Sequence, residues 1–134
     1  MNYPKLELSL LPRTYAICSF PPDCALPELG NISSILSITK TSKETTIVCD
    51  ENRIPGDCHK SENFKCIKVE GSFDLDAIGV IAGISKPLAQ SKISIFVVST
   101  YDTDYVLIHA KDIDMAVSCL TGFGHTFVDL AERS

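Results

Sequence analysis

One stretch of the sequence indicates the fold most clearly: Ile93-Ser94-Ile95-Phe96-Val97-Val98-Ser99-Thr100-Tyr101-Asp102-Thr103-Asp104. Residues 93–100 are apolar on both faces, which is typical of a central strand that is covered on each side. The polar residues 101–104 turn the chain, and residues 105–109 return it as a second strand. The stretch therefore predicts an antiparallel hairpin inside an α+β domain.

Strand and helix patterns alternate on both sides of this hairpin. A short strand is predicted at 66–69 and a helix at 75–89, where apolar residues recur at helical spacing. A second helix follows Asp112, a good N-cap, and a last strand covers residues 125–128. The order βαββαβ is that of the ferredoxin-like fold, which places two helices on one face of a four-stranded antiparallel sheet.

The predicted helix at 75–89 carries a further signal in its two glycines. Gly79 and Gly83 are four residues apart, so they would share one helix face and let a neighbouring backbone approach. Val80 and Ile84 would make the opposite side apolar as well, and a helix that is apolar nearly all round must be buried deeply. We therefore expect this helix to pack against another helix or half-domain.

The first half of the chain is predicted to consist mainly of strands and turns. Residues 5–11 and 14–20 read as strands that end at prolines. Residues 32–39 and 45–49 are predicted to pair as a hairpin, after a single helical turn at 27–30. Residues 50–63 carry little periodic apolar content and are predicted to connect the halves. The predicted division is therefore a helix-poor first unit at 1–62 and a second unit at 63–134.

Composition excludes several classes of function. The chain has 134 residues, 45% of them hydrophobic, and 12 basic against 17 acidic residues give a net charge of −5. A nucleic-acid-binding protein normally carries a basic footprint, so direct binding of nucleic acid is not expected. No apolar stretch approaches the roughly 18 residues of a membrane span. The start of the chain lacks the pattern of a secretion signal, so a cytoplasmic location is expected.

The cysteine content is high for a chain of this size. In a reducing compartment a disulfide framework is rare, so we expect most of these thiols to pack as small hydrophobic groups. The clearest cases are those in apolar strand-like or helical patterns: Cys18, Cys49 and Cys119.

Neither a metal site nor an enzyme active site is predicted. The set Cys49, Cys58, His59 and Cys66 lacks the paired spacing of a structural zinc site. No nucleophile elbow, phosphate-binding loop or calcium loop is present, so no catalytic residue, metal or cofactor is predicted. An enzyme that uses Cys58 or His59 remains only as an alternative.

The polar residues 99–104 allow two interpretations. In the first they form a hairpin turn in which Asp and Thr side chains satisfy local backbone groups. In the second, Asp104 presents a carboxylate to an ammonium or guanidinium group and Thr100 adds a hydroxyl. Backbone amides near Gly79 would then receive a carboxylate, and an α-amino acid offers both charges.

The sequence resembles the small tandem ACT-domain proteins related to the CASTOR-type arginine sensors. The resemblance rests on the run at 93–107, on Val69-Glu70-Gly71-Ser72-Phe73-Asp74 leading into Gly79-Val80, and on Leu10-Leu11-Pro12. Ile47-Val48-Cys49-Asp50-Glu51-Asn52-Arg53-Ile54-Pro55 also fits the first half of that family.

The resemblance implies two ferredoxin-like ACT units packed side by side, the first of them degenerate. In the arginine sensors a threonine and an aspartate of the strand-turn segment, together with backbone at a glycine-hydrophobic pair, hold the ligand. The matching positions here are Thr100, Asp104, Gly79 and Val80. Because the sensors are about twice this length, a homodimer would be needed to build equivalent interfaces.

Two further hypotheses accompany the resemblance. The leading one is a non-enzymatic regulatory protein that binds a free amino acid between ACT units and passes the signal to a protein partner. The alternative is an interaction module that kept the ACT fold and lost the ligand.

Overall fold

The computed structural model describes residues 3–25, 35–71 and 77–128, and the chain divides into two compact units. Unit 1 combines Met1–Pro12 with Lys65–Ser134, and unit 2 is Arg13–Phe64. Unit 2 therefore interrupts the sequence of unit 1.

The N-terminal strand explains why this division differs from the predicted units at 1–62 and 63–134. β1 (Glu7–Leu10) pairs antiparallel with β5 (His59–Val69), where Leu8 is opposite Val69, and parallel with β8 (Thr126–Val128), where Leu8 is opposite Phe127. The alternation in residues 5–11 correctly predicted a strand. It could not predict the partners, because a period of two is the same whichever strands lie beside it.

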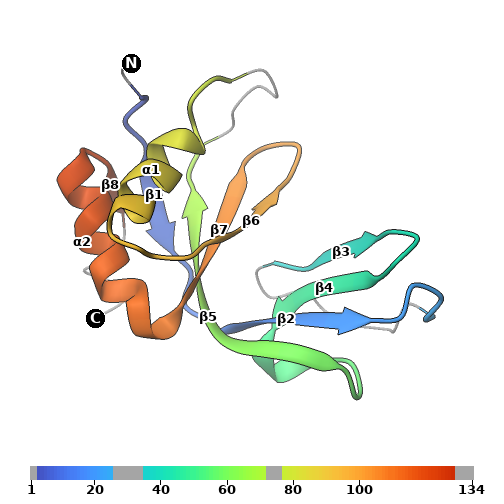
Figure 1. Ribbon diagram of the computed structural model, residues 1–134. Helices are drawn as coiled ribbons and strands as arrows, with labels where there is room; N and C mark the ends of the chain where they lie inside the picture. The colour runs from blue at the N-terminus through green and yellow to red at the C-terminus, as the bar shows by residue number, and fades with distance from the viewer. Residues whose placement is uncertain (1–2, 26–34, 72–76, 129–134) are drawn as a thin grey trace. The chain divides into compact units, whose positions relative to one another are not determined.

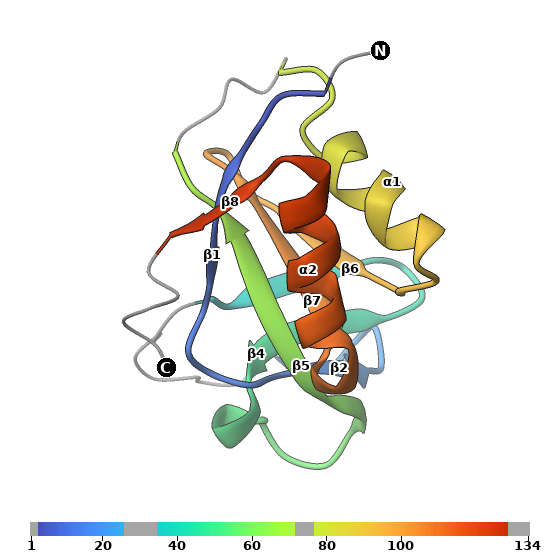
Figure 2. The same cartoon turned by 90° about the vertical axis from the view of Figure 1, so that its left-hand side faces the viewer.

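Unit 1 contains the predicted βαββαβ order and one additional strand. The elements are β5, α1 (Ala82–Gln90), β6 (Phe96–Ser99), β7 (Asp104–His109), α2 (Ile113–Phe123) and β8, with the short 3-10 helix η2 (Ala110–Asp112) before α2. Its strands lie in the order β8-β1-β5-β7-β6, so β1 occupies the place between β5 and β8. Both helices cover one face of this sheet, as predicted (Figures 1 and 2).

The core of unit 1 lies between that face and the two helices. Aliphatic side chains from β1, β5 and β7 meet side chains from α1 and α2, and each is removed from water. The main contributors are Leu6, Leu8, Ile67, Val69, Ile84, Leu88, Val106, Ile108, Ala116 and Leu120. Burial of a single Leu or Ile of this kind contributes about 1.5–3 kcal/mol.

Helix α1 begins at Ala82, so the prediction of a helix through Gly79 and Val80 is wrong. Gly79 has φ 84°, a left-handed conformation that glycine favours and that a continuing α-helix does not contain. Gly79 and Gly83 therefore do not share a helix face. The partner that the helix was expected to need is α2 of the same unit.

Strand β6 is not the central strand that residues 93–100 predicted. Among the strands that the structure describes it pairs with β7 alone, and Phe96 is 37% exposed. Ile93, which precedes the strand, supplies apolar surface to the core instead. The apolar residues 93–100 thus include a core residue, Ile93, and an edge strand, β6. Periodicity alone cannot distinguish these two environments.

Unit 2 is an antiparallel sheet in the order β3-β4-β2-β5. Its strands are β2 (Tyr15–Phe20), β3 (Ser37–Lys40), β4 (Thr45–Asp50) and the first residues of β5. The predicted pairing of residues 32–39 with 45–49 is confirmed for β3 and β4. The predicted helical turn at 27–30 lies outside the described residues.

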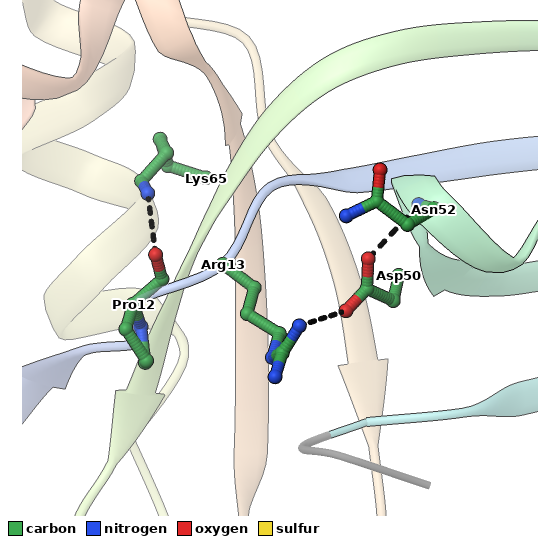
Figure 3. Close-up of polar contacts among 5 residues, drawn as sticks. All are labelled: Pro12, Arg13, Asp50, Asn52 and Lys65. Atoms are coloured by element: carbon green, nitrogen blue, oxygen red, sulfur yellow. Dashed lines mark hydrogen bonds and ion pairs between the residues drawn. The ribbon is translucent and has the colours of Figure 1, made fainter. Parts of the chain in front are cut away.

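The predicted connection at 50–63 contains regular structure. It holds the 3-10 helix η1 (Glu51–Arg53) and the start of β5 at His59. The first five residues of β5 are exposed, so they lack the apolar alternation by which a strand is found. Asp50, only 4% exposed, accepts the backbone N–H of Asn52 at 2.9 Å and lies 3.1 Å from Arg13 Nη1 (Figure 3). These partners offset the cost of burying its charge.

His125 joins three parts of unit 1. It follows Gly124, which ends α2 with φ 115°, and its side chain is buried. Nδ1 accepts the Leu6 N–H at 3.1 Å, and Nε2 lies 2.7 Å from the Gly83 carbonyl oxygen. A neutral imidazole with its proton on Nε2 satisfies both contacts, because it offers one donor and one acceptor.

No helix within the described ranges combines the length and apolarity required to cross a membrane.

Replacing His125 with alanine should destabilise unit 1. The change leaves the Leu6 N–H and the Gly83 carbonyl buried without partners, and we expect the free energy of unfolding to fall by about 2–4 kcal/mol. Urea denaturation followed by circular dichroism measures this. His59→Ala, at an exposed position, is the control, and an equally small change in both variants would contradict the bridging role of His125.

The thiol of Cys66 should make the protein less stable in alkali. Burial raises the pKa of Cys66 to about 12 from its ordinary value of 9.0. Between these values the unfolded chain binds fewer protons than the folded chain, so the free energy of unfolding falls as pH rises, by at most about 1.4 kcal/mol per pH unit. Denaturation in reductant from pH 8 to 10 should show a smaller slope for Cys66→Ala. Met115→Ala, at an exposed position without a titratable group, should keep the wild-type slope.

Candidate functional site

The turn between β6 and β7 is organised by Thr100. Its N–H donates to the Thr103 carbonyl at 2.8 Å. Its Oγ1 donates to the same carbonyl at 3.1 Å and accepts the Thr103 N–H at 3.2 Å. Ser99 and Asp104 form the strand pair that closes the turn. The first interpretation of residues 99–104 is a turn held by local side-chain hydrogen bonds. Thr100 has that role, because its hydroxyl bonds to the backbone of Thr103.

The same arrangement occurs in the β3–β4 hairpin of unit 2. Thr41 donates its N–H to the Glu44 carbonyl at 2.9 Å, and its Oγ1 accepts the Glu44 N–H at 3.1 Å. A threonine at the first turn position thus serves the backbone in both hairpins. A hydroxyl carries two lone pairs, so the Thr100 Oγ1 can still accept one further hydrogen bond.

Asp104 places a carboxylate at the start of β7. Its side chain is half-buried, and Oδ1 accepts the Ser99 hydroxyl at 2.5 Å. Oδ2 has no hydrogen-bond partner within the described part of the chain. The serine fixes one oxygen and leaves the other able to accept from a cation.

Thr103 is a site residue that the sequence analysis did not single out. It is buried, and its Oγ1 donates to the Val69 carbonyl at 2.6 Å. The bond fastens the turn to the end of β5, from which the chain leads towards Gly79. No sequence signal distinguishes Thr103 from Thr100, because both are threonines of one polar turn.

Gly79 and Val80 lie immediately before α1. The Gly79 carbonyl accepts the Gly83 N–H at 3.0 Å, and the Val80 side chain packs in the core of unit 1. Only the backbone of Val80 could therefore serve a ligand. No hydrogen bond or ion pair joins Gly79 or Val80 to Thr100 or Asp104 among the described residues.

The residues considered for zinc are divided between the units. Cys66 belongs to unit 1, whereas Cys49, Cys58 and His59 belong to unit 2. Within the described ranges no three His, Cys, Asp or Glu side chains form a group that could hold a metal ion. None of the six cysteines, all of which lie in the described ranges, is in a disulfide in the structure.

Two family models match the chain. Residues 60–122 match the ACT domain, and residues 13–57 match a model described as an N-terminal domain. The two matches fall on either side of the start of β5.

Solved structures extend the similarity over most of the chain. Protein Atu0741 from Agobacterium tumefaciens is 33% identical, with 93% of each chain covered and a TM-score of 0.86. A Vibrio cholerae protein of unknown function is 20% identical, with 90% and 91% covered and a TM-score of 0.72. The regulatory subunit of aspartate kinase from Thermus thermophilus is 12% identical, with 87% and 96% covered and a TM-score of 0.59. The last two similarities establish a shared fold.

Substituting Thr103 with valine should loosen the turn. Valine keeps the shape but removes the hydrogen bond to the Val69 carbonyl, and we expect the free energy of unfolding to fall by about 1–3 kcal/mol. The rate of hydrogen exchange of the β6 and β7 amides should increase, and urea denaturation should show the lower free energy of unfolding. Thr126→Val, at an exposed strand position, is the matched control. Equal stability of the two variants would show that Thr103 does not anchor the turn.

Proposed function

Because this chain contains an ACT domain and belongs to one family with Agobacterium tumefaciens Atu0741, we propose that it is a regulatory protein that binds a free amino acid. ACT domains are regulatory modules that bind small molecules. We also propose that the chain is related to the CASTOR-type arginine sensors. A cytoplasmic, non-enzymatic role belongs to the same proposal.

The observation that carries the proposal is the carboxylate of Asp104. It is held by Ser99 at a fixed strand end, and its Oδ2 has no partner among the described residues. A half-buried carboxylate with one available oxygen suits the ammonium group of an amino acid, because charge-assisted hydrogen bonds are the stronger ones. The remaining lone pair of Thr100 Oγ1 supports the same role.

Backbone at Gly79 and Val80 would receive the other end of the ligand. Gly79 itself has no side chain and has φ 84°, and it lies on the N-terminal side of α1, where backbone N–H groups at the positive end of the helix would receive a carboxylate. In this proposal Thr100 and Asp104 bind the ammonium group, and Gly79 and Val80 bind the carboxylate.

Two exposed side chains favour a site that a second chain completes. Ile78 and Tyr101 are 79% and 80% exposed, and each adjoins one half of the proposed site, next to Gly79 and Thr100 respectively. Large apolar groups of this kind are enriched where proteins associate. We therefore include a homodimer, with the amino acid between ACT units, in the proposal.

The alternative is an interaction module without a ligand. The observation that favours it is the shared turn chemistry of Thr100 and Thr41, since the threonine hydroxyl needs no ligand to explain its position. In that case Asp104 would act in assembly, and a protein partner would replace the amino acid.

Calorimetric titration with each of the twenty amino acids tests the proposal. We expect at least one to bind, and Asp104→Asn to weaken that binding by about 10- to 100-fold, because a charge-assisted hydrogen bond contributes about 1.5–3 kcal/mol. Asp102→Asn, in the same turn but exposed, should bind as the wild type does.

The same variants separate the two functions. Absence of binding for all twenty amino acids, together with a changed sedimentation coefficient of Asp104→Asn, would favour the interaction module. Equal affinities of the Asp104 and Asp102 variants would remove Asp104 from the ligand site.

A further inference from the structure

Three thiols of unit 2 lie on one face of its sheet. In the register of β2 and β4, Cys18 is opposite Ile47 and Cys49 is opposite Ala16, so Cys18 and Cys49 point to the same side as diagonal neighbours. In the register of β2 and β5, Ser19 is opposite His59, so continuation by one residue brings Cys58 to that same side. Cys18, on the middle strand, thus has a thiol on either side.

Packing confirms what the register indicates. Cys18 and Cys49 belong to the buried apolar cluster of unit 2, and Cys58 packs against that cluster while remaining half-buried. Burial contributes most to the raised pKa of Cys18, and Cys49 and Cys58 are both close enough to Cys18 to contribute to it as well. Cys58 is therefore the member of this thiol cluster (Cys18, Cys49 and Cys58) that a molecule in solution can reach.

The two neighbours of Cys18 differ in their freedom to move. Cys49 is held inside the β4 ladder, and its Sγ lies 3.9 Å from the Arg53 carbonyl oxygen. Cys58 precedes the first residue of β5 and follows Gly56, which has φ 74°. A disulfide requires its two Cα atoms to lie within about 7 Å, and diagonal strand neighbours are about 7–8 Å apart, so the backbone of one partner must shift for the bond to form. Cys58 can adjust to meet this requirement more easily than Cys49.

We propose that Cys58 and Cys18 form a reversible disulfide by exchange with a low-molecular-weight disulfide such as oxidised glutathione. The Cys58 thiolate attacks one sulfur of the reagent, forms a mixed disulfide and releases one glutathione thiolate. The Cys18 sulfur then attacks the Cys58 sulfur, gives up its proton to solvent or to the leaving group, and displaces the second glutathione. Two protein thiols are oxidised, and one reagent disulfide is reduced to two thiols.

The second step should be the slow one. Burial raises the pKa of Cys18 to about 12, and the neighbouring thiols add to the effect. Little thiolate exists near neutral pH, so closure of the disulfide should accelerate about tenfold per pH unit between pH 7 and 10. The mixed disulfide at Cys58 should therefore accumulate first at low pH and disappear on raising it.

The test uses the full-length protein, oxidised glutathione and mass spectrometry of the intact chain and of its peptides without reduction. We expect a glutathione adduct at Cys58, followed by a product that has lost two hydrogens and joins the peptides of Cys18 and Cys58. Reductant should restore the starting mass. This modification lies in unit 2 and does not depend on whether an amino acid binds in unit 1.

Serine variants of single cysteines show which thiol takes part in each step of the exchange. Cys18→Ser should stop at the Cys58 adduct, Cys58→Ser should give neither product, and Cys49→Ser should react as the wild type does. Cys24→Ser, which changes a half-buried thiol outside the thiol cluster, is the matched control. If a substitution at a buried cysteine prevents folding, the peptide map of the wild-type protein still shows whether Cys18 and Cys58 are joined.

Three results would overturn the proposal. One is a wild-type map in which Cys24 is modified and Cys58 is not. The others are a disulfide that joins Cys18 to Cys49, and a Cys58 adduct that persists in the wild type at pH 10.

Discussion

The backbone hydrogen bonds along β1 are the constraint on which unit 1 depends. Glu7 accepts the N–H of Glu70 at 2.8 Å, and on the other edge Leu6 accepts the N–H of Thr126 at 2.9 Å. Among the described strands β8 has no partner except β1. A strand from the start of the chain therefore holds the last strand in the sheet, and His125 adds a side-chain bond at the same place. The helices can bury their apolar sides only because this five-stranded surface exists.

The sequence predicted those parts of the fold that depend on local patterns. The order of elements from β5 to β8 and the β3–β4 hairpin follow from periodicity and turn residues. The partners of β1 and the edge position of β6 could not be predicted, because they depend on contacts between residues far apart in the chain. The late start of α1 was missed because Ile78 and Ile81, which precede the helix, continue its apolar spacing.

For the candidate site, too, the sequence predicted the features that depend on local patterns and missed those that depend on distant contacts. The turn predicted at residues 101–104 lies between β6 and β7 in the structure. The structure adds that Asp104 is half-buried and bonded to Ser99, while its role in binding a ligand stays a prediction. Residue type alone could not distinguish the two threonines of that turn: Thr100 serves its own turn, whereas Thr103 holds the turn to β5. Cysteine spacing likewise gave no sign that Cys18 meets Cys49 and Cys58, since strand register creates that group.

The interruption of unit 1 by unit 2 has a consequence for how the chain folds during synthesis. Unit 2 is continuous, so its sheet can form as soon as residue 64 has left the ribosome. Unit 1 must wait for β8, whose neighbour His125 contacts a residue 119 positions earlier. Contacts at such separation slow folding, because a long loop must close before they form. Until then the edge of β1 that pairs with β8 has no partner. The other edge can pair with β5 once residue 69 has emerged, and an already folded unit 2 shortens the effective loop that separates β1 from β5.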